Sequence, residues 1–226
     1  MKQDLLFSKE PENKEEFAKG FDEFYTKFGR LYDALFKIFP IWKHWISRTL
    51  PHIEGRQVLE VSFGTGYLLT MFANQFETYG VDLNERMVNI ARKNLKKIGL
   101  SAELYQANIE SLPFENETFD TIVNTMAFSG YPDGNKAMSE IRRVLKTRGR
   151  LIIIDINYPQ NGNWVGKKLI NLWILSGDLV RDMKTLFEKF TFDFLMKKLV
   201  DLALSISMWL LKDKCWFFLT SPPLCS

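Results

Sequence analysis

Two glycines and an aspartate have the residue types and the spacing of a nucleotide site. Gly64 and Gly66 flank Thr65 shortly after the mostly apolar run at 58–61, and Asp82 follows Gly66 by 16 residues. Because glycine has no Cβ, a turn that contains it lets the backbone approach a ligand closely. A carboxylate at the end of the following strand can accept hydrogen bonds from both hydroxyls of a ribose. The pattern therefore predicts a site for a ligand that contains a nucleoside.

The spacing of the glycines argues against a dinucleotide. A dinucleotide fingerprint places a third glycine or alanine three positions after the second, where it lets the helix pack closely and hold a pyrophosphate. That position is Leu69 in this chain. A nicotinamide-dependent oxidoreductase is therefore a less favoured interpretation of the turn.

The sequence around this turn resembles the class I S-adenosylmethionine methyltransferases. The run from Val58 to Gly66 is similar to motif I of that family, and further segments follow in the family's order over roughly residues 20–156. The nearest subgroup is the one similar to ubiquinone/menaquinone biosynthesis C-methyltransferases (methyltransferase type 11). The later segments are Asn108, Glu110 and Leu112–Phe114, which resemble the adenine-side loop, Phe119–Val123, which resembles the fourth strand, and Arg142–Lys146 with Gly149–Asp155, which resemble the helix and fifth strand that follow.

The resemblance implies S-adenosyl-L-methionine as the cofactor and assigns residues to it. The family usually has glycine at the position of Ser62 and aspartate at that of Asn108. Serine is small enough for a tight turn but disfavours a positive φ, and asparagine keeps an acceptor oxygen for the adenine amino group without the charge. We therefore expect a reduced cofactor affinity. The residues assigned to the cofactor are Glu60, Ser62, Gly64, Gly66, Asp82, Leu83, Met87, Asn108, Ile109, Glu110, Asn124 and Met126.

Short β-rich runs alternate with helical runs between residues 56 and 155, which is typical of a parallel doubly wound sheet. Asn84 has the residue type of a helix N-cap, and Gly99 stands where a C′ glycine should. The predicted fold class is α/β, a Rossmann-like doubly wound and mostly parallel sheet with N-terminal and C-terminal helical lid segments. The expected strands are 56–61, 77–82, 102–107, 119–124 and 149–155, and the expected helices are 66–75, 84–98 and 133–146.

The whole chain, 1–226, is predicted to be a single methyltransferase domain. Apolar residues at helical spacing, with a break at Pro40, predict an N-terminal helical cap over 1–52, ahead of a cofactor-binding core over 53–156. Residues 157–226 are predicted to form a C-terminal helical lid, helical from Trp164 to Leu211. The family's sheet usually ends with two further strands, and here only Lys214–Thr220 is expected to form one.

The acceptor is expected beside the carboxyl ends of the fourth and fifth strands, where ligands of open parallel sheets bind. In related methyltransferases, an N-terminal helix that carries a tyrosine closes over the cofactor. The alternative for each tyrosine is ordinary packing with a satisfied hydroxyl. The expected pocket residues are Tyr25, Tyr32, Phe128, Tyr131 and Tyr158.

The sequence identifies no catalytic residue. Methyl transfer needs a general base only if the acceptor must lose a proton. His44 and His52 are the two histidines of the chain, and both are interpreted as helix-surface or capping residues.

Composition excludes several other classes. A net charge of +3 is too small to favour nucleic acid. Cys215 and Cys225 have no CxxC or histidine-rich neighbourhood, so neither a metal site nor a disulfide framework is expected. The first residues lack the charged-then-apolar pattern of a secretory signal, which favours the cytoplasm.

The sequence therefore predicts a cytoplasmic methyltransferase, monomer or homodimer, for a small and fairly apolar acceptor such as a quinone precursor, a phenol or a lipid-like molecule. The apolar lid, with lysines at 167, 168, 197 and 198, leaves open a peripheral membrane contact. The alternatives are a non-catalytic or weakly active S-adenosylmethionine-binding protein and, less favoured, a nicotinamide-dependent oxidoreductase.

Overall fold

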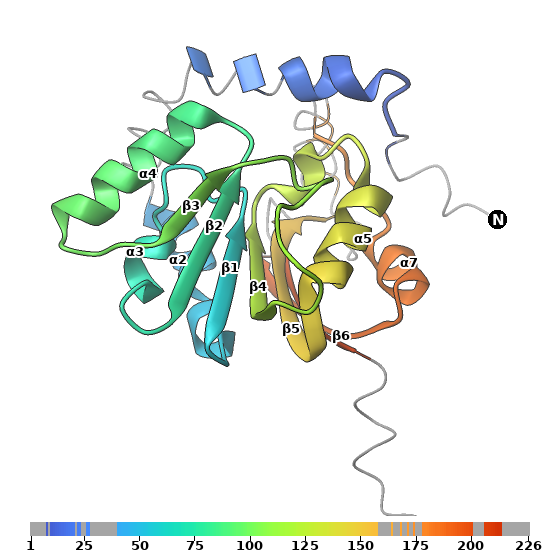
Figure 1. The fold of residues 1–226 in the computed structure, drawn as a ribbon. Coiled ribbons are helices and arrows are strands. Elements are labelled where there is room, and N and C mark those ends of the chain that lie inside the picture. The colour runs from blue at the N-terminus through green and yellow to red at the C-terminus, as the bar shows by residue number, and fades with distance from the viewer. Residues whose placement is uncertain are drawn as a thin grey trace, which may run out of the picture.

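A seven-stranded mixed sheet is the centre of the molecule (Figure 1). The computed structural model describes residues 8, 10–20, 22–23, 26–27, 40–157, 164, 168, 171, 174, 178–200 and 206–213. The strand order is β3-β2-β1-β4-β5-β7-β6, and β1 to β5 are parallel, whereas β7 runs antiparallel to both β5 and β6. The strands are β1 Gln57–Val61, β2 Glu77–Asp82, β3 Glu103–Gln106, β4 Phe119–Thr125, β5 Leu145–Ile156, β6 Phe192–Val200 and β7 Ile206–Asp213.

Helices cover both faces of this sheet, and two apolar clusters fill the layers. On one face pack α2 (Pro40–Ser47), α3 (Leu69–Phe72) and α4 (Glu85–Lys97). On the other pack α5 (Gly134–Val144) and α7 (Met183–Lys189). Because both faces are covered, most residues of the central strands β1 and β4 are buried, as in parallel sheets generally. Two short 3-10 helices, η1 (Leu50–His52) and η2 (Phe128–Gly130), precede β1 and follow β4.

The α/β half of the chain agrees with the sequence prediction. All five predicted strands are present, although β5 begins earlier, at Leu145, and the helix after the glycine turn is only the short α3. The Asn84 side chain accepts a hydrogen bond from the Met87 backbone N–H and caps α4. Gly99 follows the end of α4 with a φ of 74°. These signals act within a few residues of each other, which is why the sequence alone shows them.

The prediction that Trp164 to Leu211 is helical is wrong for its second half. Residues 192–200 and 206–213 are strands β6 and β7, and Ile153 of β5 pairs with Trp209 of β7. The apolar residues of these strands are compatible with both the helical and the strand period. Pairing of β7 with β5, which leaves Trp209 only 2% exposed, favours the strand. The sheet is therefore complete without Lys214–Thr220, which lies outside the described residues.

The N-terminal part of the chain lies across the end of the sheet where β1 and β2 finish (Figure 1, blue). Residues 14–20 are helical, and the Lys14 ammonium pairs with the Asp133 carboxylate at 2.5 Å. The Asn84 Nδ2 donates to Asp22 Oδ1 at 2.8 Å and to Thr26 Oγ1 at 2.7 Å. The Asn84 side chain thus caps α4 and also holds the N-terminal segment at the carboxyl end of β2. No helix within the described ranges is long and apolar enough to cross a membrane.

Candidate active site

Every second residue of the five-residue turn after β1 has a positive φ angle. The φ values are 54° at Ser62, 56° at Gly64 and 75° at Gly66. Only glycine adopts this region without cost, so Ser62 is held there at an energy of about 1 kcal/mol. Backbone hydrogen bonds fix the turn, with the Ser62 N–H donating to the Val81 carbonyl and the Gly66 N–H to the Phe63 carbonyl. Strain of this kind concentrates where a loop must hold a functional shape.

The two glycines of the turn have different surroundings. A Cβ on Gly64 would meet no protein atom within 4 Å, and Gly64 lines a pocket. A Cβ on Gly66 would lie 2.7 Å from the Ala91 Cβ of α4, and Gly66 does not line the pocket. Gly64 therefore keeps space open for a ligand, whereas Gly66 lets the turn pack against α4.

Asp82 stands at the carboxyl end of β2 and joins the turn to α4. Its Oδ2 accepts a hydrogen bond from the Gly64 N–H at 2.8 Å, and its Oδ1 accepts one from the Asn84 N–H at 2.9 Å. Burial raises the pKa of Asp82 to about 6, because desolvation of the charge outweighs those two hydrogen bonds. The carboxylate is thus already oriented toward the pocket by the backbone.

Glu60 is a buried carboxyl group at the same pocket. It is 2% exposed, and its Oε2 has no hydrogen-bond partner among the described residues. Burial, and then the neighbouring Asp82 charge, raise the pKa of Glu60 well above its usual value, although a hydrogen bond from the Leu69 backbone opposes this. Buried carboxyl oxygens are normally paired, so an unpaired one at a pocket indicates a place for a ligand's donor or positive charge.

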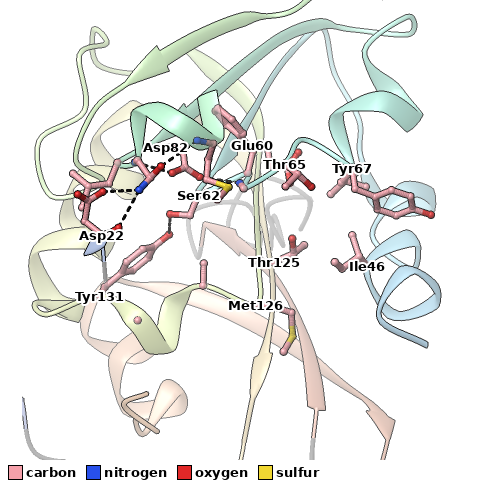
Figure 2. A pocket seen from close by; sticks show the side chains of 18 of the residues that line it. Asp22, Ile46, Glu60, Ser62, Thr65, Tyr67, Asp82, Thr125, Met126 and Tyr131 are labelled. Atoms are coloured by element: carbon pink, nitrogen blue, oxygen red, sulfur yellow. Dashed lines mark hydrogen bonds between the residues drawn. The ribbon is translucent and has the colours of Figure 1, made fainter. Parts of the chain in front are cut away.

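A hydroxyl network closes the pocket at the end of β4. The Tyr131 hydroxyl lies 2.8 Å from the Ser62 Oγ and accepts from the Asn124 Nδ2 at 2.6 Å. Burial raises the pKa of Tyr131, which favours the protonated hydroxyl. Figure 2 shows Tyr131 and Ser62 on one side of the pocket and Tyr67 and Ile46 on the other. Met126, with a φ of 56°, lies between them at the end of β4.

The pocket contains some of the predicted site residues and not others. Asn108 is exposed and accepts from the Glu110 N–H, so it orders its own loop beside β2, and a contact with adenine stays a prediction. Tyr25, Tyr32 and Tyr158 lie outside the described residues. The predicted residues that line the pocket are Glu60, Ser62, Gly64, Asp82, Leu83, Met87, Met126 and Tyr131, whereas Gly66, Asn108, Ile109, Glu110, Asn124 and Phe128 do not. Neither His44 nor His52 lines it.

Several lining residues were not predicted. Asp22 and Asp178 come from segments far away in sequence, and no motif announces them. Ile46 of α2 and Tyr67 with Leu68 of the turn supply apolar surface. Only the position of Tyr67 and Leu68 directly after the glycine turn offered a local signal.

The raised pKa of Asp82 predicts a pH dependence of stability. The pKa is 3.8 for an ordinary aspartate and about 6 in the fold, so ionising Asp82 costs the folded state energy. This energetic cost of ionisation is absent below about pH 4 and fully present above about pH 7. Asp82→Asn has no ionisable group at this position and therefore does not bear the cost. Between these limits we expect the free energy of unfolding of the variant, relative to wild type, to rise by about 2 kcal/mol. Urea unfolding at the two pH values measures this, and a pH-independent difference would contradict it.

This chain is similar in sequence and fold to known methyltransferases. Residues 59–153 match a family model described as a methyltransferase domain. The ubiquinone/menaquinone biosynthesis C-methyltransferase UbiE of Escherichia coli O1:K1 / APEC is 34% identical over 130 residues, which is 55% of this chain and 52% of that protein. This chain thus matches the curated relative over about half of its length.

Solved structures share the fold. A SAM-dependent methyltransferase from Thermotoga maritima superposes with a TM-score of 0.69 at 17% identity, covering 84% of this chain and 99% of that one. Geranyl diphosphate C-methyltransferase from Streptomyces coelicolor A3(2), solved with S-adenosyl-L-homocysteine, gives a TM-score of 0.62 at 14% identity and covers 75% and 80%.

The strand order is that of the class I methyltransferase fold. Residues 59–153, less than half of the chain, match the type 11 methyltransferase domain, and the chain is distantly similar to the UbiE C-methyltransferases.

Proposed function

We propose that this protein binds S-adenosylmethionine in the pocket beyond β1, β2 and β4 and transfers its methyl group to a small, fairly apolar acceptor. The observation that carries the proposal is the charge of the pocket. Its acidic lining residues are Asp22, Glu60, Asp82 and Asp178, and no lysine or arginine is among the lining residues that the structure describes. Such a lining suits a ligand with a sulfonium and an ammonium group and disfavours a pyrophosphate.

The residues present fit this cofactor. Asp82 would accept hydrogen bonds from the ribose hydroxyls. The methionine chain would lie over Gly64, where a Cβ would meet no protein atom within 4 Å. The unpaired Oε2 of Glu60 would accept from the ammonium group. When bound, the cofactor supplies an electrophilic methyl carbon on a positively charged sulfur.

The contribution of the chain is then mainly to position the reactants. Holding an acceptor in line with the methyl group, with water excluded, is worth roughly 7–11 kcal/mol. The ordered turn at 62–66 and the hydrogen-bonded end of β4 provide rigid surfaces for this on two sides of the pocket.

An apolar acceptor is supported by the other lining residues. Ile46, Phe63 and Leu68 line the pocket together with Tyr67 and Met126, a mixture that suits a ring or an isoprenoid-like group better than a sugar. The names of two similar proteins, a quinone-pathway C-methyltransferase and a geranyl diphosphate C-methyltransferase, are consistent with this class. A non-catalytic S-adenosylmethionine-binding protein is the second candidate, because no histidine base lines the pocket.

Calorimetry tests cofactor binding. We expect wild type to bind S-adenosylmethionine and S-adenosylhomocysteine, and Asp82→Ala to bind about tenfold more weakly or worse, because it loses charge-assisted hydrogen bonds worth about 1.5–3 kcal/mol. Asp193→Ala, a substitution in β6 outside the pocket, is the control and should bind as wild type does. No binding to wild type at millimolar ligand would contradict the proposal, and equal affinities would show that Asp82 does not hold the ribose.

A methylation screen then separates the two candidates. Phenolic, quinol and lipid acceptors, with hydrophilic acceptors beside them, are incubated with the cofactor, and methylated product is detected by mass spectrometry. Product from hydrophilic acceptors only would contradict the apolar class, and binding without product from any acceptor would favour the non-catalytic protein. Co-sedimentation with anionic vesicles at low and moderate salt tests the peripheral membrane contact that the sequence leaves open.

A further inference from the structure

Asp178 is a carboxylate of the pocket to which no hydrogen bond with the cofactor is assigned. Asp178 lines the pocket from the segment at 178–182, directly before α7. Three contacts fix this segment to η2 and to the residue after it. The Leu179 N–H donates to the Ser129 carbonyl at 2.8 Å, and the Arg181 guanidinium donates to the carbonyls of Phe128, at 3.0 Å, and Tyr131. Asp178 is thus held on the same structure that carries the Tyr131 hydroxyl.

Ser129 connects Asp178 to a second, buried carboxyl group. Its Oγ donates to Asp178 Oδ1 at 2.9 Å, and its backbone N–H donates to Asp155 Oδ2 at 2.8 Å. Asp155 is 2% exposed and also accepts from the Ile156 N–H at 2.7 Å. Burial, supported by the nearby charge of Asp178, raises the pKa of Asp155 to about 6. Asp155 does not line the pocket, whereas Asp178 does, so only Asp178 can meet a ligand there.

Asp178 shares the pocket with features that point to a ligand. Gly64 and the unpaired Oε2 of Glu60 line it, and so does Met126 at the end of β4. The segment with Asp178 lies over η2, on the β4 side of the pocket, whereas Asp82 and Gly64 belong to the β1 and β2 side. The acceptor is expected on the β4 side, beyond the cofactor, which places it next to Asp178.

We propose that Asp178 is the general base of the reaction, for an acceptor such as a phenol that must lose a proton when it is methylated. This inference rests on the proposed function of the same pocket. Ser129 and Asp155 are positioning residues, which hold the Asp178 carboxylate through the Ser129 hydroxyl.

The step balances in atoms and charge. An Asp178 carboxylate oxygen takes the phenolic proton, and the electron pair released at the acceptor forms the bond to the methyl carbon. The carbon–sulfur bond breaks, and its pair stays on sulfur, which becomes neutral. When a ring carbon is the methylated atom, that carbon then loses its hydrogen as a proton to solvent, and the ring oxygen takes a proton back from Asp178, which restores the phenol and releases one proton overall. General base catalysis contributes about 10²–10⁴-fold in rate.

The test compares two acceptors in wild type and Asp178→Asn. Catechol and 1,4-dihydroxynaphthalene must lose a proton, whereas 4-nitrothiophenol is already ionised at neutral pH. We expect kcat with the phenolic acceptors to fall at least about 100-fold, and kcat with the thiolate to change less than about threefold. Calorimetry should show unchanged binding of S-adenosylhomocysteine, and of catechol in its presence. Asp182→Asn, a substitution at the N-cap of α7 outside the pocket, is the control and should leave both rates unchanged.

The outcomes separate failure of the general-base role of Asp178 from failure of the proposed function. Equal losses with phenol and thiolate, or an unchanged phenolic rate, would overturn the role of Asp178 as base. A wild type that binds the cofactor but methylates none of these phenols would overturn the acceptor class and with it this inference. Failure of wild type to bind the cofactor at all would instead contradict the proposed function, so the two failures are distinguishable.

Discussion

Gly66→Ala is expected to lower the free energy of unfolding by about 3 kcal/mol, from overpacking and the cost of a left-handed residue together. The added Cβ would lie 2.7 Å from the Ala91 Cβ and 3.3 Å from its Cα, and the φ of Gly66 is 75°. Ala91 is fully buried in α4, so the turn and the helix would have to separate. Urea unfolding monitored by tryptophan fluorescence measures the loss.

Gly99→Ala is the matched control for this prediction. Gly99 has a φ of 74°, nearly that of Gly66, but a Cβ there would meet no atom within 4 Å. The free energy of unfolding of Gly99→Ala should therefore fall by only about 1 kcal/mol, the cost of the left-handed backbone conformation. If the two variants lose the same stability, close packing of Gly66 on α4 is not the reason for a glycine at this position.

Gly64→Val is expected to weaken binding of S-adenosylmethionine by at least about 100-fold, or about 2.7 kcal/mol. A Cβ at Gly64 would meet no protein atom, so the valine side chain would not clash with the fold and would occupy the pocket instead. The free energy of unfolding should fall by only about 1–2 kcal/mol, the cost of a φ of 56° for a branched residue. Calorimetry and urea unfolding measure the two effects separately.

Gly99→Val controls for the backbone cost of that change. It places the same side chain at a similar φ, at the end of α4 and outside the pocket. It should lose about as much stability as Gly64→Val and bind the cofactor as wild type does. Near-wild-type affinity of Gly64→Val would show that the ligand does not use this pocket.

Both predictions depend on features that only coordinates reveal. The sequence assigned Gly64 and Gly66 to the cofactor together, because both belong to one motif. The structure gives them different neighbours, a pocket for Gly64 and Ala91 for Gly66. Ser62 has the positive φ that the sequence analysis considered unfavourable for a serine. Its Oγ contacts the Tyr131 hydroxyl, an interaction that the sequence did not predict.

The sequence by itself determined the parallel half of the sheet, the turn after β1 and the place of Asp82. These features are encoded locally, because an apolar run, a glycine turn and a helix cap each act within a few residues. Only the tertiary structure decided the rest. Whether residues 192–213 form helix or strand depends on pairing with β5, and Asp178 reaches the pocket through a contact with Ser129, 49 residues earlier. Asp22 does so through Asn84, 62 residues later. Such long-range contacts leave no periodic pattern in the sequence, since they depend on how separate elements pack together in space.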